Sequence, residues 1–268
     1  MNKDIFKLLD GIKKENAVIG TPTFKKHDRV MIIDGLNLFL RNFAMINYLN
    51  KSGNHTGGLG GFLRSLGSLI KTLEPTEVYI VFDGKGSSDT RKNLLPEYKS
   101  GRHVNRITNW DIFANVDEEN LAKVNQIVRL VKYLKCLPIK VTSLDRVEAD
   151  DIIAHLSQTL VAKHNSKVFI VSADQDYLQL VTDKITLYRP VKRDFYTPSK
   201  IKEEYGVIVE NFIIYKTLMG DNSDKVKGVK GLGKKKLLSM FPELAEKPQS
   251  LKQIIATSEK KYKDHIIY

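Results

Sequence analysis

Hydrophobic residues along the chain follow two patterns, short unbroken apolar runs and longer stretches with helical spacing. The runs at 29–34, 77–83 and 167–172 are typical of strands buried on both faces of a parallel sheet. Between them, apolar residues recur every three or four positions, as in 62–73 and 121–134, which indicates amphipathic helices. Because strands alternate with helices, the pattern predicts an α/β fold with a mostly parallel central sheet and helices on both faces.

The same pattern divides the chain into regions. Residues 1–28 have weak periodicity and are predicted to be an N-terminal extension of one short helix and a linker. The strand and helix alternation occupies 29–190 and includes short strands at 136–141 and 185–188, the first with Cys136 buried in it. It is interrupted by a polar, basic segment at 85–116. From 191–268 the strands stop, and a helical region is predicted.

Acidic residues recur where the predicted strands end and where one helix begins. They are Asp34, Asp83 and Asp174 after strands, and Glu148, Asp150 and Asp151 at the helix start. One aspartate after a strand is usually a turn former, and acids at a helix start are favoured by the helix dipole. Ligands of parallel sheets bind at the carboxyl ends of the strands. Since several strand ends carry an acid, we expect these side chains to converge there.

Three more acids, Asp176, Asp221 and Asp224, follow in two short clusters and bring the candidate set to nine. If the nine carboxylates converge, their mutual repulsion requires cations to neutralise it. Oxygen ligands without cysteine or patterned histidine select Mg²⁺ or Mn²⁺ rather than Zn²⁺. Two such ions about 3.5–4 Å apart form the arrangement that clamps the attacking and leaving oxygens in phosphoryl hydrolysis.

Charge and cysteine content narrow the class of partner and the compartment. Lys and Arg number 43 against 31 Asp and Glu, and the net charge of +12 favours nucleic acid over a membrane surface, although solubility alone can produce a basic protein. No apolar run approaches the ~20 residues that span a membrane, and the charged N-terminus lacks the apolar part of a secretory signal. One cysteine permits neither an internal disulfide nor a thiolate zinc site. A reducing cytoplasm is therefore predicted.

Five acidic segments resemble, in order, the motifs of the flap endonuclease / 5′→3′ exonuclease family. They lie at 32–37, 82–85, 148–151, 172–176 and 219–224. The likeness is greatest to the bacteriophage enzymes and to the 5′-nuclease domain of bacterial DNA polymerase I, and it extends from about residue 29 to 240. It implies a PIN-like 5′-nuclease core and a location in the bacterial cytoplasm, with a phage gene as one suggested origin.

The resemblance also implies how the acids divide between two or more Mg²⁺ or Mn²⁺ ions. The first group is Asp34, Asp83, Glu148 and Asp150, with Asp151 beside them; the second is Asp174, Asp176, Asp221 and Asp224. Asp34, Asp83, Asp150 and Asp174 are also predicted to be catalytic. In the family's chemistry, metal-activated water attacks a phosphodiester and leaves a 5′-phosphate and a 3′-hydroxyl.

The basic segment that begins at Lys85 is predicted to be either a solvated surface loop or a functional one. The resemblance implies a helical arch or gateway over the site at about 85–116, through which a single-stranded 5′ end passes. By motif, Lys99 and Arg102 resemble the pair that steadies the scissile phosphate, and Tyr98 resembles the base-stacking residue. The DNA-binding residues predicted here are Lys85, Arg91, Lys92, Tyr98, Lys99 and Arg102.

A glycine turn at 228–233 precedes a run of lysines. Exposed backbone N–H groups at a helix start suit a DNA phosphate, which predicts contacts through Gly231, Gly233, Lys234 and Lys235. The turn resembles the helix-hairpin-helix motif of the same family, here at about 218–240. That motif grips duplex DNA and often binds K⁺ through backbone carbonyls, so K⁺ is a further predicted cofactor.

The resemblance predicts a structure-specific, metal-dependent 5′ nuclease of DNA replication, with flap endonuclease and 5′→3′ exonuclease activity. Its predicted substrates are DNA flaps, DNA 5′ ends and RNA primers on DNA. Predicted protein partners are a replication polymerase or a single-strand-binding protein, and the chain is expected to be a monomer. The lead at 1–28 and the early end after the hairpin depart from the family pattern, which predicts a weakened grip on duplex DNA.

Two alternative functions belong to other classes of protein, a DNA-binding protein without catalytic activity and a ribonuclease. A non-catalytic relative would only bind branched DNA, but a pure binder has no reason to place nine acids beside a phosphate. A PIN-type ribonuclease would share the sheet and a smaller acidic cluster, but this reading does not explain the basic gateway or the glycine turn.

Overall fold

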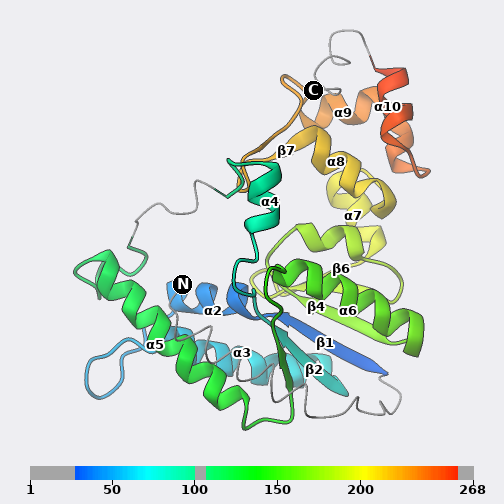
Figure 1. Cartoon of the computed structure of the whole chain (residues 1–268). Helices are drawn as coiled ribbons and strands as arrows, with labels where there is room; N and C mark the ends of the chain where they lie inside the picture. Colours follow the sequence, from blue (N-terminus) through cyan, green and yellow to red (C-terminus); the bar gives the residue numbers. More distant parts are fainter. Residues whose placement is uncertain (1–27, 100–106, 259–268) are drawn as a thin grey trace. The chain divides into compact units, whose positions relative to one another are not determined.

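The computed structural model of this protein describes residues 28–99 and 107–258 (Figure 1). The predicted extension at 1–28 therefore lies outside the described residues except for its last position. The described residues form two compact units. The first contains 28–89, 107–174 and 188–194, and the second contains 90–99, 175–187 and 195–258.

The main sheet has the strand order β3-β2-β1-β4-β5-β6. Its strands are β1 (Arg29–Asp34), β2 (Glu77–Val81), β3 (Lys140–Thr142), β4 (Lys167–Val171), β5 (Ile185–Arg189) and β6 (Asp194–Tyr196). β1 pairs in parallel with both β2 and β4, and β2 pairs in parallel with β3. The predicted mostly parallel sheet is confirmed, and the carboxyl ends of β1, β2 and β4 lie at one edge.

The helices of the first unit cover both faces of this sheet (Figure 1). They are α2 (Gly35–Met45), α3 (Gly57–Leu73), α5 (Val116–Leu134) and α6 (Ala149–His164). Met31 and Ile33 of β1 belong to one buried cluster with residues of α2, α3 and α5. α6 packs against β1 and β4. Because successive side chains of a strand point to opposite faces, the unbroken apolar runs supply a core on each side.

The strand predicted at 136–141 is wrong in position. The chain turns after α5, with Leu137 N–H donating to Leu134 O, and β3 begins only at Lys140. Pro138 has no N–H to donate to a ladder, which favours the turn. Cys136 is consequently exposed rather than buried in a strand.

The loop before α5 is anchored to that helix by a buried carboxylate. Thr108 N–H donates to Glu119 Oε2 at 2.7 Å, and Lys123 Nζ lies 2.9 Å from Glu119 Oε1. Burial alone would raise the pKa of Glu119, but the hydrogen bonds from Thr108 and Lys123 outweigh it and hold this pKa below its ordinary value. Glu119 is therefore charged at neutral pH and fixes the start of α5.

The described part of the second unit is largely helical, but the prediction that strands stop at 191 is wrong, because β6 continues the main sheet and a short strand pair follows later. Its principal elements are α7 (Pro198–Tyr205), α8 (Phe212–Met219), α9 (Lys234–Met240) and α10 (Leu251–Thr257), with the small antiparallel pair β7 (Gly220–Asp221) and β8 (Val226–Lys227). The 3-10 helix η2 (Asp176–Leu180) belongs to the same unit, as does all but the first residue of α4 (Asp89–Leu94). No helix within the described ranges is long and apolar enough to cross a membrane.

Candidate active site

The carboxyl ends of β1 and β4 are joined by polar side chains. Asp34 ends β1, and its Oδ1 accepts from Asn37 N–H at 3.0 Å, which caps α2. Its Oδ2 accepts from Ser172 Oγ at 3.3 Å, while Asn37 Oδ1 accepts from Ala173 N–H at 3.0 Å. Asn37 and Ser172 were not predicted as site residues. Their signal in the sequence is their place inside the acidic segments 32–37 and 172–176.

The end of β2 is joined to the start of α6 in a similar way. Asp83 Oδ1 accepts from Ala149 N–H at 2.8 Å, so the aspartate supplies a negative charge at the helix N-terminus. Glu148, the residue before the helix, is 2% exposed. Asp150 and Asp151 follow in the first turn, where Asp151 N–H donates to Asp150 Oδ1 at 2.8 Å. The structure thus brings Asp83 to the acidic start of α6, as expected for adjacent strand ends.

Asp174 lies with these residues in the first unit, and its N–H donates to Ser172 Oγ at 3.1 Å. The first unit therefore holds six of the predicted acids. We call this group the strand-end set: Asp34, Asp83, Glu148, Asp150, Asp151 and Asp174. The resemblance assigns Asp174 to the second metal group, and this division of the acids between metal ions stays a prediction.

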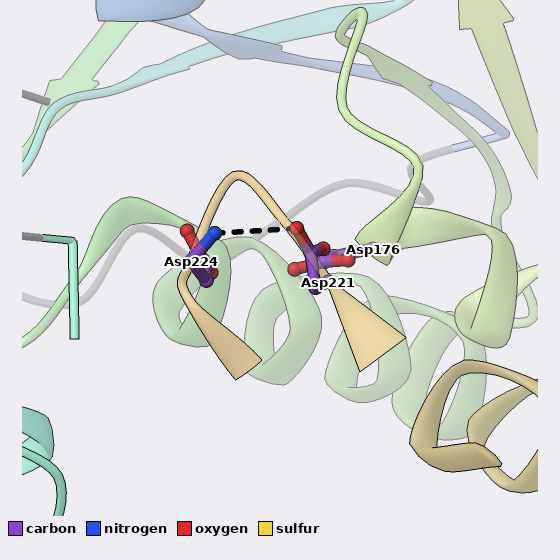
Figure 2. Close-up of side chains that lie close together, drawn as sticks. All are labelled: Asp176, Asp221 and Asp224. Carbon is purple, nitrogen blue, oxygen red and sulfur yellow. Dashed lines mark hydrogen bonds between the residues drawn. The ribbon is translucent and has the colours of Figure 1, made fainter. Parts of the chain in front are cut away.

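The remaining three acids form a tight cluster within the second unit, which we call the hairpin set. Asp176 begins η2, Asp221 lies in β7 and Asp224 lies in the turn between β7 and β8. Each offers one carboxylate oxygen, and these three oxygens all lie within 4.8 Å of one another (Figure 2). Asp221 Oδ1 also accepts from Ser223 N–H at 2.8 Å and from Asp224 N–H at 3.2 Å, which folds the turn.

A lysine neutralises part of this cluster. Lys216 Nζ, from α8, donates to Asp221 Oδ2 at 2.6 Å and also to Asp176 Oδ1. Burial alone would raise the pKa of Asp221, but hydrogen bonds from Lys216 and Ser223 hold it well below its ordinary value. Burial alone would lower the pKa of Lys216, but its bonds to Asp176 and Asp221 raise it. Asp221 and Lys216 are therefore both charged at neutral pH. Lys216 was missed by sequence analysis, because it is one lysine on an apolar helix.

Two glycines make the hairpin possible. Gly220 has φ +74, a left-handed conformation that other residues rarely adopt, and a Cβ there would lie 2.2 Å from Gly228 N. A Cβ on Gly228 would in turn lie 2.3 Å from the carbonyl carbon and oxygen of Met219. Close approach of these two backbones positions Asp221 and Asp224 at the turn.

The segment predicted as an arch is described only in part, and Arg102 lies outside the described residues. Lys85 and Lys92 are exposed, and Arg91 is half-buried. Lys99 N–H donates to Asp224 O at 3.4 Å, which ties the end of this segment to the hairpin turn. Tyr98 is 7% exposed, and Lys99 Nζ lies 4.8 Å from the centre of its ring. Tyr98 is therefore buried in this structure, and its base-stacking role stays a prediction.

The predicted glycine turn has the expected backbone at one of its positions. Gly231 has φ +76, and nothing lies within 4 Å of an added Cβ, while Gly233 is the residue before α9. Lys235 is exposed. Lys234 Nζ donates to Glu204 O at 2.5 Å and so is held against α7. The helix-hairpin-helix assignment and its K⁺ site stay predictions.

The hairpin set has the composition that a hard divalent ion requires. Its donors are carboxylate oxygens, they approach one another closely, and a positive ammonium already stabilises two of them. Asp34, Asp83 and Glu148 offer the same donor type at the strand ends. Both sets therefore offer oxygen donors that suit a divalent metal ion.

Comparison with known proteins identifies the family to which this chain belongs. A family model described as the 5′-3′ exonuclease, N-terminal resolvase-like domain, matches residues 29–206. The 5′-3′ exonuclease of Buchnera aphidicola subsp. Schizaphis graminum is 33% identical over 224 residues, 83% of this chain and 72% of that protein. DNA polymerase I of Bacillus subtilis is 31% identical over 243 residues, which are 89% of this chain but 26% of the polymerase.

A solved structure also resembles this chain. The bacteriophage T5 flap endonuclease in complex with DNA and metal ions matches with a TM-score of 0.68 and 25% identity, covering 89% of this chain and 83% of that one. The fold and the acids thus define a 5′ nuclease core. The chain belongs to the 5′-3′ exonuclease family, which confirms the resemblance found in the sequence.

Proposed function

We propose that this chain is a structure-specific, divalent-metal-dependent 5′ nuclease that hydrolyses phosphodiester bonds near the 5′ ends and flaps of DNA. The observation that carries the proposal is the close approach of three carboxylates, Asp176, Asp221 and Asp224, in a chain of the 5′-3′ exonuclease family. The metal-bound, DNA-bound T5 flap endonuclease of the same fold supports it.

The acids would hold Mg²⁺ or Mn²⁺, with the strand-end set and the hairpin set each contributing ligands. A bound divalent ion supplies an activated water and neutralises charge on the attacked phosphate. Asp34 and Asp83 are already oriented for such a role, because each is fixed by a backbone N–H donor. The Asn37 N–H and the Ser172 hydroxyl, which donate to Asp34, would keep it in place as charge on the phosphate develops.

Basic residues would hold the nucleic acid. Lys99 lies at the hairpin turn, where it could stabilise negative charge on the scissile phosphate, a role that the family motif also assigns to Arg102. Exposed Lys85, Lys92 and Lys235 would contact DNA phosphates without reading sequence. RNA primers annealed to DNA are a second proposed substrate. A replication polymerase and a single-strand-binding protein are proposed partners.

The test is incubation of the protein with an end-labelled duplex that carries a 5′ flap, in Mg²⁺ and in EDTA. Cleavage should require Mg²⁺ and release products with 5′-phosphates. Asp174→Asn should abolish cleavage while a gel-shift assay shows retained binding of the flap. Asp183→Asn removes an exposed acid of the second unit that belongs to neither set and should cleave normally.

The same assay separates the alternatives. A non-catalytic binder would shift the flap substrate in the gel without cutting it under any metal condition. A PIN-type ribonuclease would cut single-stranded RNA and leave the DNA flap intact. Unchanged flap cleavage by Asp174→Asn would reject the proposed site.

A further inference from the structure

Lys216 contacts two acids of the hairpin set, which the proposed function assigns to a metal ion. Its Nζ contacts one carboxylate oxygen of Asp176 and lies 2.6 Å from Oδ2 of Asp221. These two acids are also members of the three-carboxylate cluster. The side chains of Lys216, Asp176 and Asp221 are only 23–31% exposed, so solvent screens their charges incompletely.

The contact has two consequences with opposite signs. Without a divalent ion, three carboxylates whose oxygens lie within 4.8 Å of one another would repel, and the ammonium of Lys216 offsets this repulsion. When a divalent ion binds, the same ammonium is a like charge at short range. Lys216 also uses lone pairs of Asp176 and Asp221 that the ion would share.

We propose that Lys216 is a built-in counter-cation of the hairpin set, and that its ammonium must leave Asp176 and Asp221 for a divalent ion to bind there. The inference rests on the proposed function in assigning these acids to a metal. It adds that Lys216 keeps the site assembled but weak for metal, so that the site fills only at high metal concentration. Lys216 is thus a positioning residue that acts through the carboxylates.

The geometry of α8 allows such a release. Lys216 lies three residues before the end of the helix at Met219 and reaches the cluster through a long, flexible side chain. Its four methylene groups let Nζ move by several bond rotations without movement of the backbone. Displacement therefore needs no rearrangement of the hairpin that holds Asp221 and Asp224.

The decisive measurement is Mn²⁺ binding to the metal-stripped protein without DNA, by calorimetry and by the paramagnetic resonance signal of free Mn²⁺. The Mn²⁺ site that the unmodified chain has and the Asp221→Asn variant lacks is taken as the hairpin set. At that site Lys216→Met should bind Mn²⁺ at least about tenfold more tightly than the unmodified chain, because it removes a like charge a few ångströms from the ion.

Two control variants isolate the cause. Lys216→Arg keeps the positive charge and should keep the weak affinity. Lys202→Met removes an exposed lysine of α7, a helix that carries no member of the hairpin set, and should leave Mn²⁺ binding unchanged. Equal or weaker Mn²⁺ binding by Lys216→Met would overturn the proposal, since it would mean that the lysine does not compete with the ion or prepares the carboxylates for it.

A measurement on the unmodified chain covers the case in which Lys216→Met does not fold. Amine acetylation of Lys216, read by mass spectrometry, should be slow in EDTA and several-fold faster in saturating Mg²⁺, because the ammonium leaves its ion pair. Lys202 should react equally in both. Equal or greater protection of Lys216 in Mg²⁺ would contradict the proposal.

These outcomes are independent of nuclease activity. If the flap is cleaved but Lys216→Met binds Mn²⁺ as before, this inference fails and the proposed function stands. If Lys216→Met binds more tightly but the unmodified chain cleaves no flap, the proposed function fails and the counter-cation stands.

Discussion

The strand-end set and the hairpin set hold carboxylates of the same chemistry by different means. Asp34 and Asp83 accept hydrogen bonds from backbone N–H groups at the starts of α2 and α6. Asp176 and Asp221 instead share the ammonium of Lys216. A backbone N–H at a helix start is fixed by the fold, whereas a lysine side chain can move away.

These two kinds of hydrogen-bond donor prepare the two sets differently for a cation. The N–H groups that orient Asp34 and Asp83 are fixed dipoles, and a dipole opposes an arriving metal ion less than a full positive charge does. The hairpin acids are balanced by a full positive charge, which stabilises them in the absence of an ion and opposes one that arrives. On this comparison we expect the hairpin set to bind a metal ion more weakly with Lys216 present than without it.

The largest effect is expected for Asp221→Ala. It removes a predicted metal ligand and the acceptor that Ser223 and Asp224 use to fold the hairpin turn. Flap cleavage under single-turnover conditions should fall at least about 10³-fold, because the variant loses both charge and geometry at the hairpin set. Retention of more than a tenth of the activity would remove the hairpin set from the chemistry.

A smaller effect should follow from Asn37→Ala, which cuts a link between β1 and β4 without removing an acid. Asn37 Oδ1 accepts from Ala173 N–H, so its loss should loosen the neighbouring Asp34 and Asp174. We expect flap cleavage to fall about 10–100-fold, with the substrate affinity little changed, as is typical for residues that orient metal ligands. The measurement is kcat and KM for the flap at saturating Mg²⁺. A change confined to KM would mean that Asn37 supports DNA binding instead.

A matched pair of glycines tests whether the hairpin set depends on its backbone. Both Gly220 and Gly231 have left-handed φ, but only at Gly220 would a Cβ meet other backbone atoms. Gly231→Ala should cost about 1–3 kcal/mol for strain alone, and Gly220→Ala should cost more. Urea unfolding measures the free energies, and Mn²⁺ binding should fall only in Gly220→Ala. Equal costs would show that the hairpin adjusts to the clash.

Much of the fold was predictable because its signals are local. Unbroken apolar runs mark β1, β2 and β4, and each is followed by polar residues at the edge of the sheet. Since parallel pairing puts strand ends together, the contact of Asp83 with the start of α6 follows from the order of the elements. β3 was misplaced, because the apolar residues after α5 form a turn that looks like a strand by composition.

The parts of the site that were missed depend on tertiary packing. Nothing local distinguishes Lys216 from the other lysines of the chain; it matters because α8 carries it to Asp176, 40 residues earlier in the sequence. Tyr98 was assigned a base-stacking role by motif alone, and its burial in the structure could not be foreseen from the sequence. Side-chain direction at such positions is decided by contacts that no single segment contains.

The smallest effect concerns Glu119, a carboxylate outside both sets. It has a backbone N–H donor, as the strand-end acids do, and a lysine partner, as the hairpin acids do. Glu119 accepts from Thr108 N–H and pairs with Lys123, and its pKa lies below the ordinary value of 4.5. A carboxyl group with a lowered folded pKa contributes stability that is present above its unfolded pKa and is lost as pH falls through the folded one. Glu119→Gln should therefore reduce the free energy of unfolding by about 1–2 kcal/mol at pH 7, a difference that shrinks below pH 4.5. Urea unfolding of both chains at several pH values measures this. A difference that does not depend on pH would show that the hydrogen bond from Thr108, which a glutamine oxygen can still accept, or packing matters more than the charge of Glu119.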